Sequence, residues 1–144
     1  MNLLFLGSGA RVSFLERFRR AFKEECIDGK IYNIEGDEYA ATQFVSDKTF
    51  FTSPFQDPKF FSELKTICEQ NKIDAIIPIS HYCLMPLMEN WEEVNSFGAK
   101  VIMSNPEAVR TCCDKYKSYE FFIKNDVPAV KTWIEIPGTI TSIF

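Results

Sequence analysis

The sequence has a single histidine, no excess of positive charge and no long apolar segment. Its single histidine, His81, has only Cys83 near it, so a zinc site is not expected. The net charge of −4 and the sequence pI near 5.1 do not provide the basic face with which proteins displace counterions from nucleic acid. No apolar run approaches the roughly 20 residues of a membrane-spanning helix. We therefore expect neither a nucleic-acid partner nor a membrane partner.

The sequence also lacks the signals of secretion. Met1 and Asn2 lead directly into an apolar segment, without the basic region or the cleavage site of a signal peptide. The five cysteines are an odd number without scaffold spacing, which is typical of reduced thiols. These features predict a cytoplasmic protein, and the 144 residues suit a single domain.

Short apolar segments alternate with amphipathic ones along the chain. Unbroken apolar runs of this kind are typical of strands covered on both faces, as in a parallel sheet. Strands are predicted at 3–6, 31–34, 49–52, 73–79 and 100–103. Helices are predicted from 12 to a stop at Gly29, at 39–44, from Pro58 onward, and at 84–97, 106–112 and 115–124. The fold class is thus α/β: one Rossmann-like three-layer domain with about five parallel strands in the order 3-2-1-4-5, a C-terminal helix and an extended tail from Val130.

In open parallel sheets, ligands bind beyond the carboxyl ends of the strands, where the strand order reverses. The predicted order places this reversal between the first and fourth strands, so that residues 7–11 face residues 80–82. Six residues are expected to line a substrate cleft there: Gly7, Ser8, Gly9, Arg11, Ser80 and His81.

The glycine turn at residues 7–9 has three interpretations. Backbone N–H groups at a helix start hold anions, and Arg11 adds a positive charge, so the turn suits the phosphate of a dinucleotide or another anionic or polar ligand. It is also the tight turn that any chain needs to enter a helix. For a dinucleotide, Glu35 lies where a ribose-binding acid belongs, but Val12 stands where the fingerprint requires a third glycine.

Three stretches, residues 2–22, 46–80 and 98–132, resemble the N-terminal part of ATP-grasp ligases. The similarity is greatest to short proteins related to the carbamoyl phosphate synthase large subunit. Its most specific part is Asp114-Lys115, which opens a helix that ends in the residues Asn-Asp-Val-Pro at 125–128. Asp126 replaces a frequent glycine, and Ala10-Arg11 keeps only the second of two arginines that many relatives carry.

The resemblance implies an activity that uses ATP and Mg²⁺. Members of the family phosphorylate a carboxylate, and an amine or another nucleophile then attacks the acyl phosphate. Lys115 matches a lysine that contacts ATP in several relatives, and the turn at residues 7–11 matches one that borders the acceptor substrate. The resemblance also implies two regions: a pre-ATP-grasp Rossmann-like domain over 1–113 and a truncated start of the ATP-grasp region over 114–144.

Beyond Thr132 the sequence has no acidic pair, no glycine-rich loop and no further lysine. We therefore expect the substrate-side domain of an ATP-dependent carboxylate–amine ligase, without catalytic or metal-binding residues and without a tightly bound cofactor. Its partners are then the missing ATP-grasp domains and a small carboxylate or amine. The alternative is a free-standing Rossmann-like module that binds a nucleotide or an anion. Self-association as a homodimer is expected through a set of apolar residues near the end of the chain: Phe121, Phe122, Val130, Trp133 and Ile134.

Overall fold

The computed structural model describes residues 1–135. The chain divides into two compact units, Met1–Ser104 and Asn105–Phe144, which are described separately below. The domain boundary between residues 113 and 114 stays a prediction. Within the described residues, no helix combines the length and the apolar character needed to cross a bilayer.

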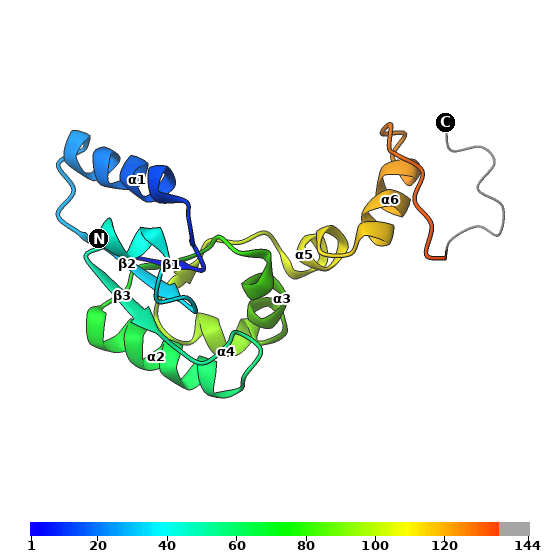
Figure 1. The fold of residues 1–144 in the computed structure, drawn as a ribbon. Coiled ribbons are helices and arrows are strands. Elements are labelled where there is room, and N and C mark those ends of the chain that lie inside the picture. The colour runs from blue at the N-terminus through cyan, green and yellow to red at the C-terminus, as the bar shows by residue number, and fades with distance from the viewer. Residues whose placement is uncertain (136–144) are drawn as a thin grey trace. The chain divides into compact units, whose positions relative to one another are not determined.

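The first unit contains a five-stranded sheet in which every pairing is parallel (Figure 1). The strands are β1 (Asn2–Leu6), β2 (Lys30–Glu35), β3 (Lys48–Phe51), β4 (Ala75–Pro78) and β5 (Lys100–Val101). Their order is β3-β2-β1-β4-β5, so the predicted order is confirmed. Leu6 at the end of β1 is in register with Ile34 of β2 on one side and with Pro78 of β4 on the other. The carboxyl ends of these three strands therefore emerge side by side.

Helices cover both faces of the sheet, which confirms the predicted three layers (Figure 1). On one face lies α1 (Val12–Glu24), and on the other lie α2 (Lys59–Asn71), α3 (His81–Glu89) and α4 (Trp91–Asn95). A short 3-10 helix, η1 (Ala41–Phe44), connects β2 to β3.

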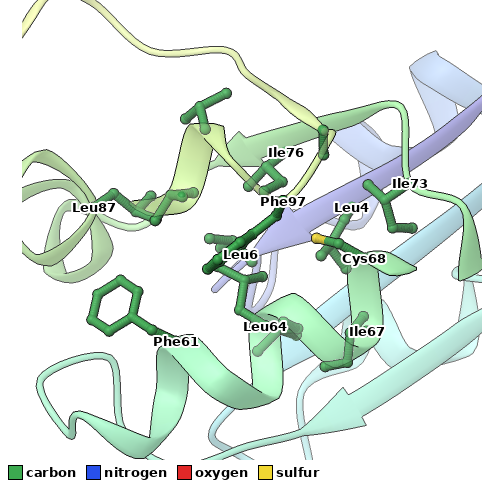
Figure 2. Close-up of a cluster of buried hydrophobic side chains, with 14 of the residues drawn as sticks. Leu4, Leu6, Phe61, Leu64, Ile67, Cys68, Ile73, Ile76, Leu87 and Phe97 are labelled. Atoms are coloured by element: carbon green, nitrogen blue, oxygen red, sulfur yellow. The ribbon is translucent and has the colours of Figure 1, made fainter. Parts of the chain in front are cut away.

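The side chains of β1 alternate between the two faces. Leu3 and Phe5 pack in the cluster under α1, whereas Leu4 and Leu6 pack in the larger cluster under α2, α3 and α4. Figure 2 shows Leu6 close to Leu64 of α2 in the larger cluster. These four side chains are all buried. A strand that is covered on both faces has no solvent-facing side, and this explains the continuous apolar run in the sequence.

The single helix predicted over residues 84–97 is wrong, because the structure has two helices there. The first begins three residues earlier, at His81, since Ser80 caps its N-terminus with a side-chain oxygen. The break between α3 and α4 falls at Asn90, whose side-chain amide donates to the carbonyl oxygen of Pro86 at 2.9 Å. This local bond competes with continuation of the helix.

The expected left-handed stop at Gly29 is also wrong. Helix α1 ends at Glu24, and the left-handed residue that follows it is Cys26, with φ 52°. Gly29 has another role: a Cβ atom there would overlap the carbonyl oxygen of Met1. Glycine is thus needed because the starts of β1 and β2 approach each other closely.

The second unit begins with α5 (Pro106–Cys112) and α6 (Lys115–Lys124), whose bounds are those predicted. Both N-caps act as expected: the Oδ1 atom of Asn105 accepts a hydrogen bond from a backbone N–H of α5, and that of Asp114 accepts two from α6. Residues 125–135 form no helix or strand. The remainder of the predicted extended tail, 136–144, lies outside the described residues.

The glycine turn after β1 provides a test of this fold. Gly7 and Gly9 have φ values of +64° and +55°, and a Cβ at Gly7 would also lie 2.8 Å from Cβ of Ser80. A left-handed alanine costs about 1–2 kcal/mol, and overpacking roughly 1–3 kcal/mol more. We expect Gly7→Ala to lower the free energy of unfolding by about 2–5 kcal/mol, and Gly9→Ala by about 1–2 kcal/mol.

Gly36→Ala is the matched control, because no atom lies within 4 Å of a Cβ there and its φ is not left-handed. Urea denaturation followed by circular dichroism measures all three variants. Equal losses for Gly7→Ala and Gly36→Ala would contradict the close packing of the turn against Ser80.

Candidate functional site

The carboxyl ends of β1, β2 and β4 are tied together by backbone hydrogen bonds. The N–H of Gly7 donates to the carbonyl oxygen of Ile34 at 2.9 Å. The N–H groups of Ile79 and Ser80 donate to the carbonyl oxygen of Leu6 at 3.0 and 3.3 Å. The turn after β1 therefore lies against the residues that follow β4, at the reversal in strand order that the sequence indicated.

Four hydrogen-bond donors converge on one oxygen of Glu35, at the end of β2. Its Oε1 atom lies 2.6 Å from the N–H nitrogen of Gly9, 2.9 Å from Oγ of Ser8, 3.0 Å from Nδ2 of Asn33 and 3.0 Å from Oγ1 of Thr42. All four side chains of this network are buried. A buried acidic group requires such partners, because burial removes its hydration.

Each hydroxyl of the network has one proton and two acceptors within reach. Oγ of Ser8 also lies 2.8 Å from Oδ1 of Asn33, and Oγ1 of Thr42 lies 2.9 Å from the carbonyl oxygen of Gly9. The N–H of Gly9 has a single proton, which it donates to Glu35. The glycine turn therefore uses this amide to hold an acid of the protein itself, at a place where a dinucleotide-binding turn holds phosphate.

The other oxygen of Glu35, Oε2, has no hydrogen-bond donor among the described residues. Among the described residues, every side-chain oxygen or nitrogen that is completely buried has a hydrogen-bond partner. Because Oε2 has none, it is partly accessible to solvent. Glu35 lines a cleft of about 400 Å³ beside the ends of β2 and β3. The cleft is lined by nine residues: Ile34, Glu35, Gly36, Thr52, Ser53, Pro54, Phe55, Gln56 and Tyr82.

Two contacts with α2 hold the wall formed by residues 52–56 in place. The N–H and the hydroxyl of Ser53 donate to the carboxylate of Glu63 on α2, at 2.8 and 3.1 Å. The ring of Phe55 packs edge-on against that of Phe60, with their centroids 5.1 Å apart. Two residues of α2, the buried Phe60 and the partly exposed Glu63, thus position this side of the cleft.

The opposite wall is the start of α3, and a hydrogen bond from Gln56 links it to the first wall. Pro86 has no N–H, so the carbonyl oxygen of Tyr82 one turn earlier receives no helical hydrogen bond. The side-chain amide of Gln56 reaches this oxygen at 3.4 Å. The ring of Tyr82 lies beside that of His81, with their centroids 3.9 Å apart.

None of the six residues predicted for the substrate cleft is among those that line this one. The prediction brought the correct segments together, because Gly7 lies against both Ser80 and Phe55. Ser8 is buried in the Glu35 network, and Gly9 donates to it. The other three lie around the start of the helices: Arg11 precedes α1 and is exposed, Ser80 caps α3, and His81 is exposed at the first position of α3. Contact of these residues with a substrate stays a prediction.

Reasoning from sequence missed Asn33, Thr42 and Phe55. One signal was present for Asn33, which interrupts an otherwise apolar stretch at the centre of β2 and is completely buried. A buried amide at such a position indicates a polar partner. No comparable signal marked Thr42, which lies in the short 3-10 helix between β2 and β3, or Phe55, which lies in the loop between β3 and α2.

Lys115 lies in the second unit, in the first turn of α6, and is exposed. Asp114 before it accepts hydrogen bonds from the N–H groups of Lys117 and Tyr116, at 3.0 and 2.9 Å. The bond from the backbone N–H of Lys117, opposed in part by desolvation, lowers the pKa of the Asp114 carboxyl below its ordinary value, so the ionised cap persists to lower pH than that of a free aspartate. Within residues 1–135, no group of three or more acidic, cysteine or histidine side chains is placed to hold a metal ion.

Three solved structures illustrate the similarity of the fold. Glycinamide-RNase-transformylase T from Mycobacterium tuberculosis matches 87% of this chain and N5-carboxyaminoimidazole ribonucleotide synthetase from Thermotoga maritima 90%, each with 14% identity and a TM-score of 0.59. N5-carboxyaminoimidazole synthetase from Staphylococcus aureus, complexed with ADP, matches 85% with 13% identity and a TM-score of 0.59. This chain covers 35%, 32% and 29% of their respective lengths.

None of the curated proteins matches this chain by sequence. A family model described as "PylC-like, N-terminal domain" matches residues 3–102, which contain the whole sheet except the first residue of β1. The resemblance to the N-terminal domains of ATP-grasp ligases is thereby confirmed. The chain belongs to the PylC-like N-terminal domain family.

Proposed function

We propose that the chain is the substrate-side domain of an ATP-dependent carboxylate–amine ligase, and that it has no activity without the ATP-binding core. The observation that carries the proposal is the family match over residues 3–102. A finer assignment, to ligases similar to the carbamoyl phosphate synthase large subunit, is supported by the Asp114 cap and the helix that begins at Lys115.

The described residues do not fit MgATP by themselves. They offer Lys115 at the start of α6, but no group of side chains that holds a metal ion. We propose that ATP and Mg²⁺ act in the complete protein, where other ATP-grasp domains bind most of the nucleotide. The ADP complex of the Staphylococcus aureus synthetase supports the use of ATP in proteins with this fold.

Helix α6 is the proposed attachment point of these further domains. It has no buried residue, and Phe121 and Ile123 are each 52% exposed. Exposed apolar clusters of this kind are typical of interaction surfaces. The same surface is our candidate for self-association as a homodimer. The five free cysteines support a reducing, cytoplasmic location.

The geometry disfavours the alternative function, a free-standing module for a nucleotide or an anion. The N–H of Gly9 is donated to Glu35, and the adjoining cleft has no lysine or arginine in its lining. A bound phosphate therefore lacks both a free amide from this residue and a cationic partner in the cleft.

The first test measures ADP release by the purified chain with ATP and Mg²⁺, with hydroxylamine present to trap any acyl phosphate. We expect the rate to equal that of the buffer, because residues 1–135 offer no group of side chains that holds a metal ion. Thermal shift measurements with NAD and with inorganic phosphate run in parallel, and we expect no rise in Tm. Clear turnover would overturn the proposal, and stabilisation by NAD would favour the alternative.

The second test supplies the ATP-grasp core, as a continuation of this chain or as a separate chain. We expect ATP-dependent ligation, and we expect Lys115→Met to lower kcat/KM for ATP by about tenfold or more, because a cation beside the nucleotide is removed. Lys124→Met is the matched control, since Lys124 is exposed at the other end of the same helix. Equal losses for the two variants would contradict a role for Lys115 at the nucleotide.

A further inference from the structure

We propose that the free edge of β3 pairs with β3 of a second copy of this chain, in antiparallel orientation, so that the two sheets become continuous. The two-fold axis of this dimer passes beside Phe50. The surface belongs to the first unit and differs from that of α6, to which we assign the attachment of further domains. The inference goes beyond the proposed function and does not depend on it.

The register of β3 with β2 determines which backbone groups of β3 remain free. The N–H of Asp47 donates to the carbonyl oxygen of Ile31 at 2.7 Å, so the odd-numbered residues of β3 bond to β2. Lys48 and Phe50, which alternate with them, direct their N–H and C=O groups away from β2. Because β3 is the outermost strand, no other strand of the described sheet receives these groups (Figure 1). An open edge of this kind is a template for another strand, and residues 48–51 contain no proline that blocks such pairing.

A two-fold axis beside Phe50 matches the two edges residue by residue. Phe50 lies opposite Phe50 of the second copy, which pairs two aromatic rings across the strands. Lys48 lies opposite Thr52 of the second copy, a residue that continues the outward alternation one position beyond β3. Each of these residues donates and accepts a backbone hydrogen bond across the axis. The contact is closed, because both copies contribute the same edge.

Two charges of opposite sign favour a second copy as the partner. Nζ of Lys48 lies 4.6 Å from the ring centre of Phe50, which packs against the core on the face of α2. On the same face, the carboxylate of Glu63 accepts from the N–H and the hydroxyl of Ser53, the residue after Thr52. Neither Lys48 nor Glu63 has a salt-bridge partner among residues 1–135. An axis perpendicular to the sheet keeps α2 on the same face in both copies, so each Lys48 comes beside Glu63 of the other copy.

The opposite face of the edge carries exposed aromatic side chains. Phe51 is 55% exposed and Tyr39 is 81% exposed, and both line one hollow beside the end of β3. The proposed pairing places Thr49 of the second copy opposite Phe51 and so covers part of this surface. Exposed apolar surface next to an open strand edge is typical of an interface between chains.

The first experiment measures mass and amide exchange of the unmodified chain at 10 μM and at 500 μM. We expect sedimentation equilibrium to give a mass near twice the 16.6 kDa of the chain at the higher concentration. We expect hydrogen exchange, followed by ¹H–¹⁵N NMR, to slow at least tenfold at the amides of Lys48, Phe50 and Thr52 between the two concentrations. The amides of Thr49 and Phe51 are internal controls, because they bond to β2 in each copy.

Two results of this experiment would overturn the proposal. A chain that remains monomeric at 500 μM would do so, and it would leave the edge to an extended segment of another protein. A dimer in which the amides of Lys48 and Phe50 exchange as fast as in the monomer would also do so, because it forms through another surface, such as that of α6. Neither result bears on the ligase assignment, since no ATP is present.

The second experiment tests the charge pair with Lys48→Glu. This variant brings like charges together at both ends of the paired strands, and we expect the dissociation constant of the dimer to rise at least tenfold. Lys100→Glu is the matched control, because it makes the same change of charge at an exposed lysine of β5, on the opposite edge of the sheet. We expect less than a twofold change for this control, and equal effects of the two variants would contradict the proposal. If Lys48→Glu does not fold, the exchange data on the unmodified chain decide the question.

Discussion

The structure at the carboxyl edge of the sheet depends on the convergence of four donors on Oε1 of Glu35. These donors come from three places: the turn after β1, the centre of β2, and η1. Hydrogen bonds to a charged group are stronger than those between neutral groups, and a buried acid deprived of them is costly. The entry into α1 and the position of η1 are therefore coupled to a single side chain, through Gly9 and Thr42.

This coupling also determines which chemistry the edge can perform. The N–H of Gly9 in the glycine turn donates to the side chain of Glu35. Glu35 thus takes the place of the phosphate that such turns bind in dinucleotide-binding folds. Glu35 holds the turn through one oxygen, and the residue also lies at the edge of a cleft that Phe55 and Tyr82 help to line. This arrangement agrees with the proposed role as a substrate-side domain, for which we propose that other domains bind the nucleotide.

Much of the fold could be predicted from local patterns. The apolar run of β1 indicated a doubly covered strand, and Asn105 and Asp114 marked the starts of α5 and α6. The two errors have different causes, one a tertiary contact and the other a local side-chain bond. Gly29 suggested the end of a helix, but glycine is required there because the backbone of Met1 passes close to it. The break at Asn90 depends on a side-chain bond that helix propensity alone does not reveal.

By itself the sequence determined the kinds of elements, their alternation, and thereby the parallel sheet with its reversal between β1 and β4. Periodicity and caps are local properties of the chain, so they can be recognised in the sequence alone. Only the tertiary structure decided what Glu35 does. The donors Gly9 and Ser8 lie 26 and 27 positions away from it in the sequence, and the cleft wall at Tyr82 lies further still. Hydrogen bonds and a shared cleft between distant segments arise from packing, and no local pattern encodes which oxygen of a carboxylate is left free.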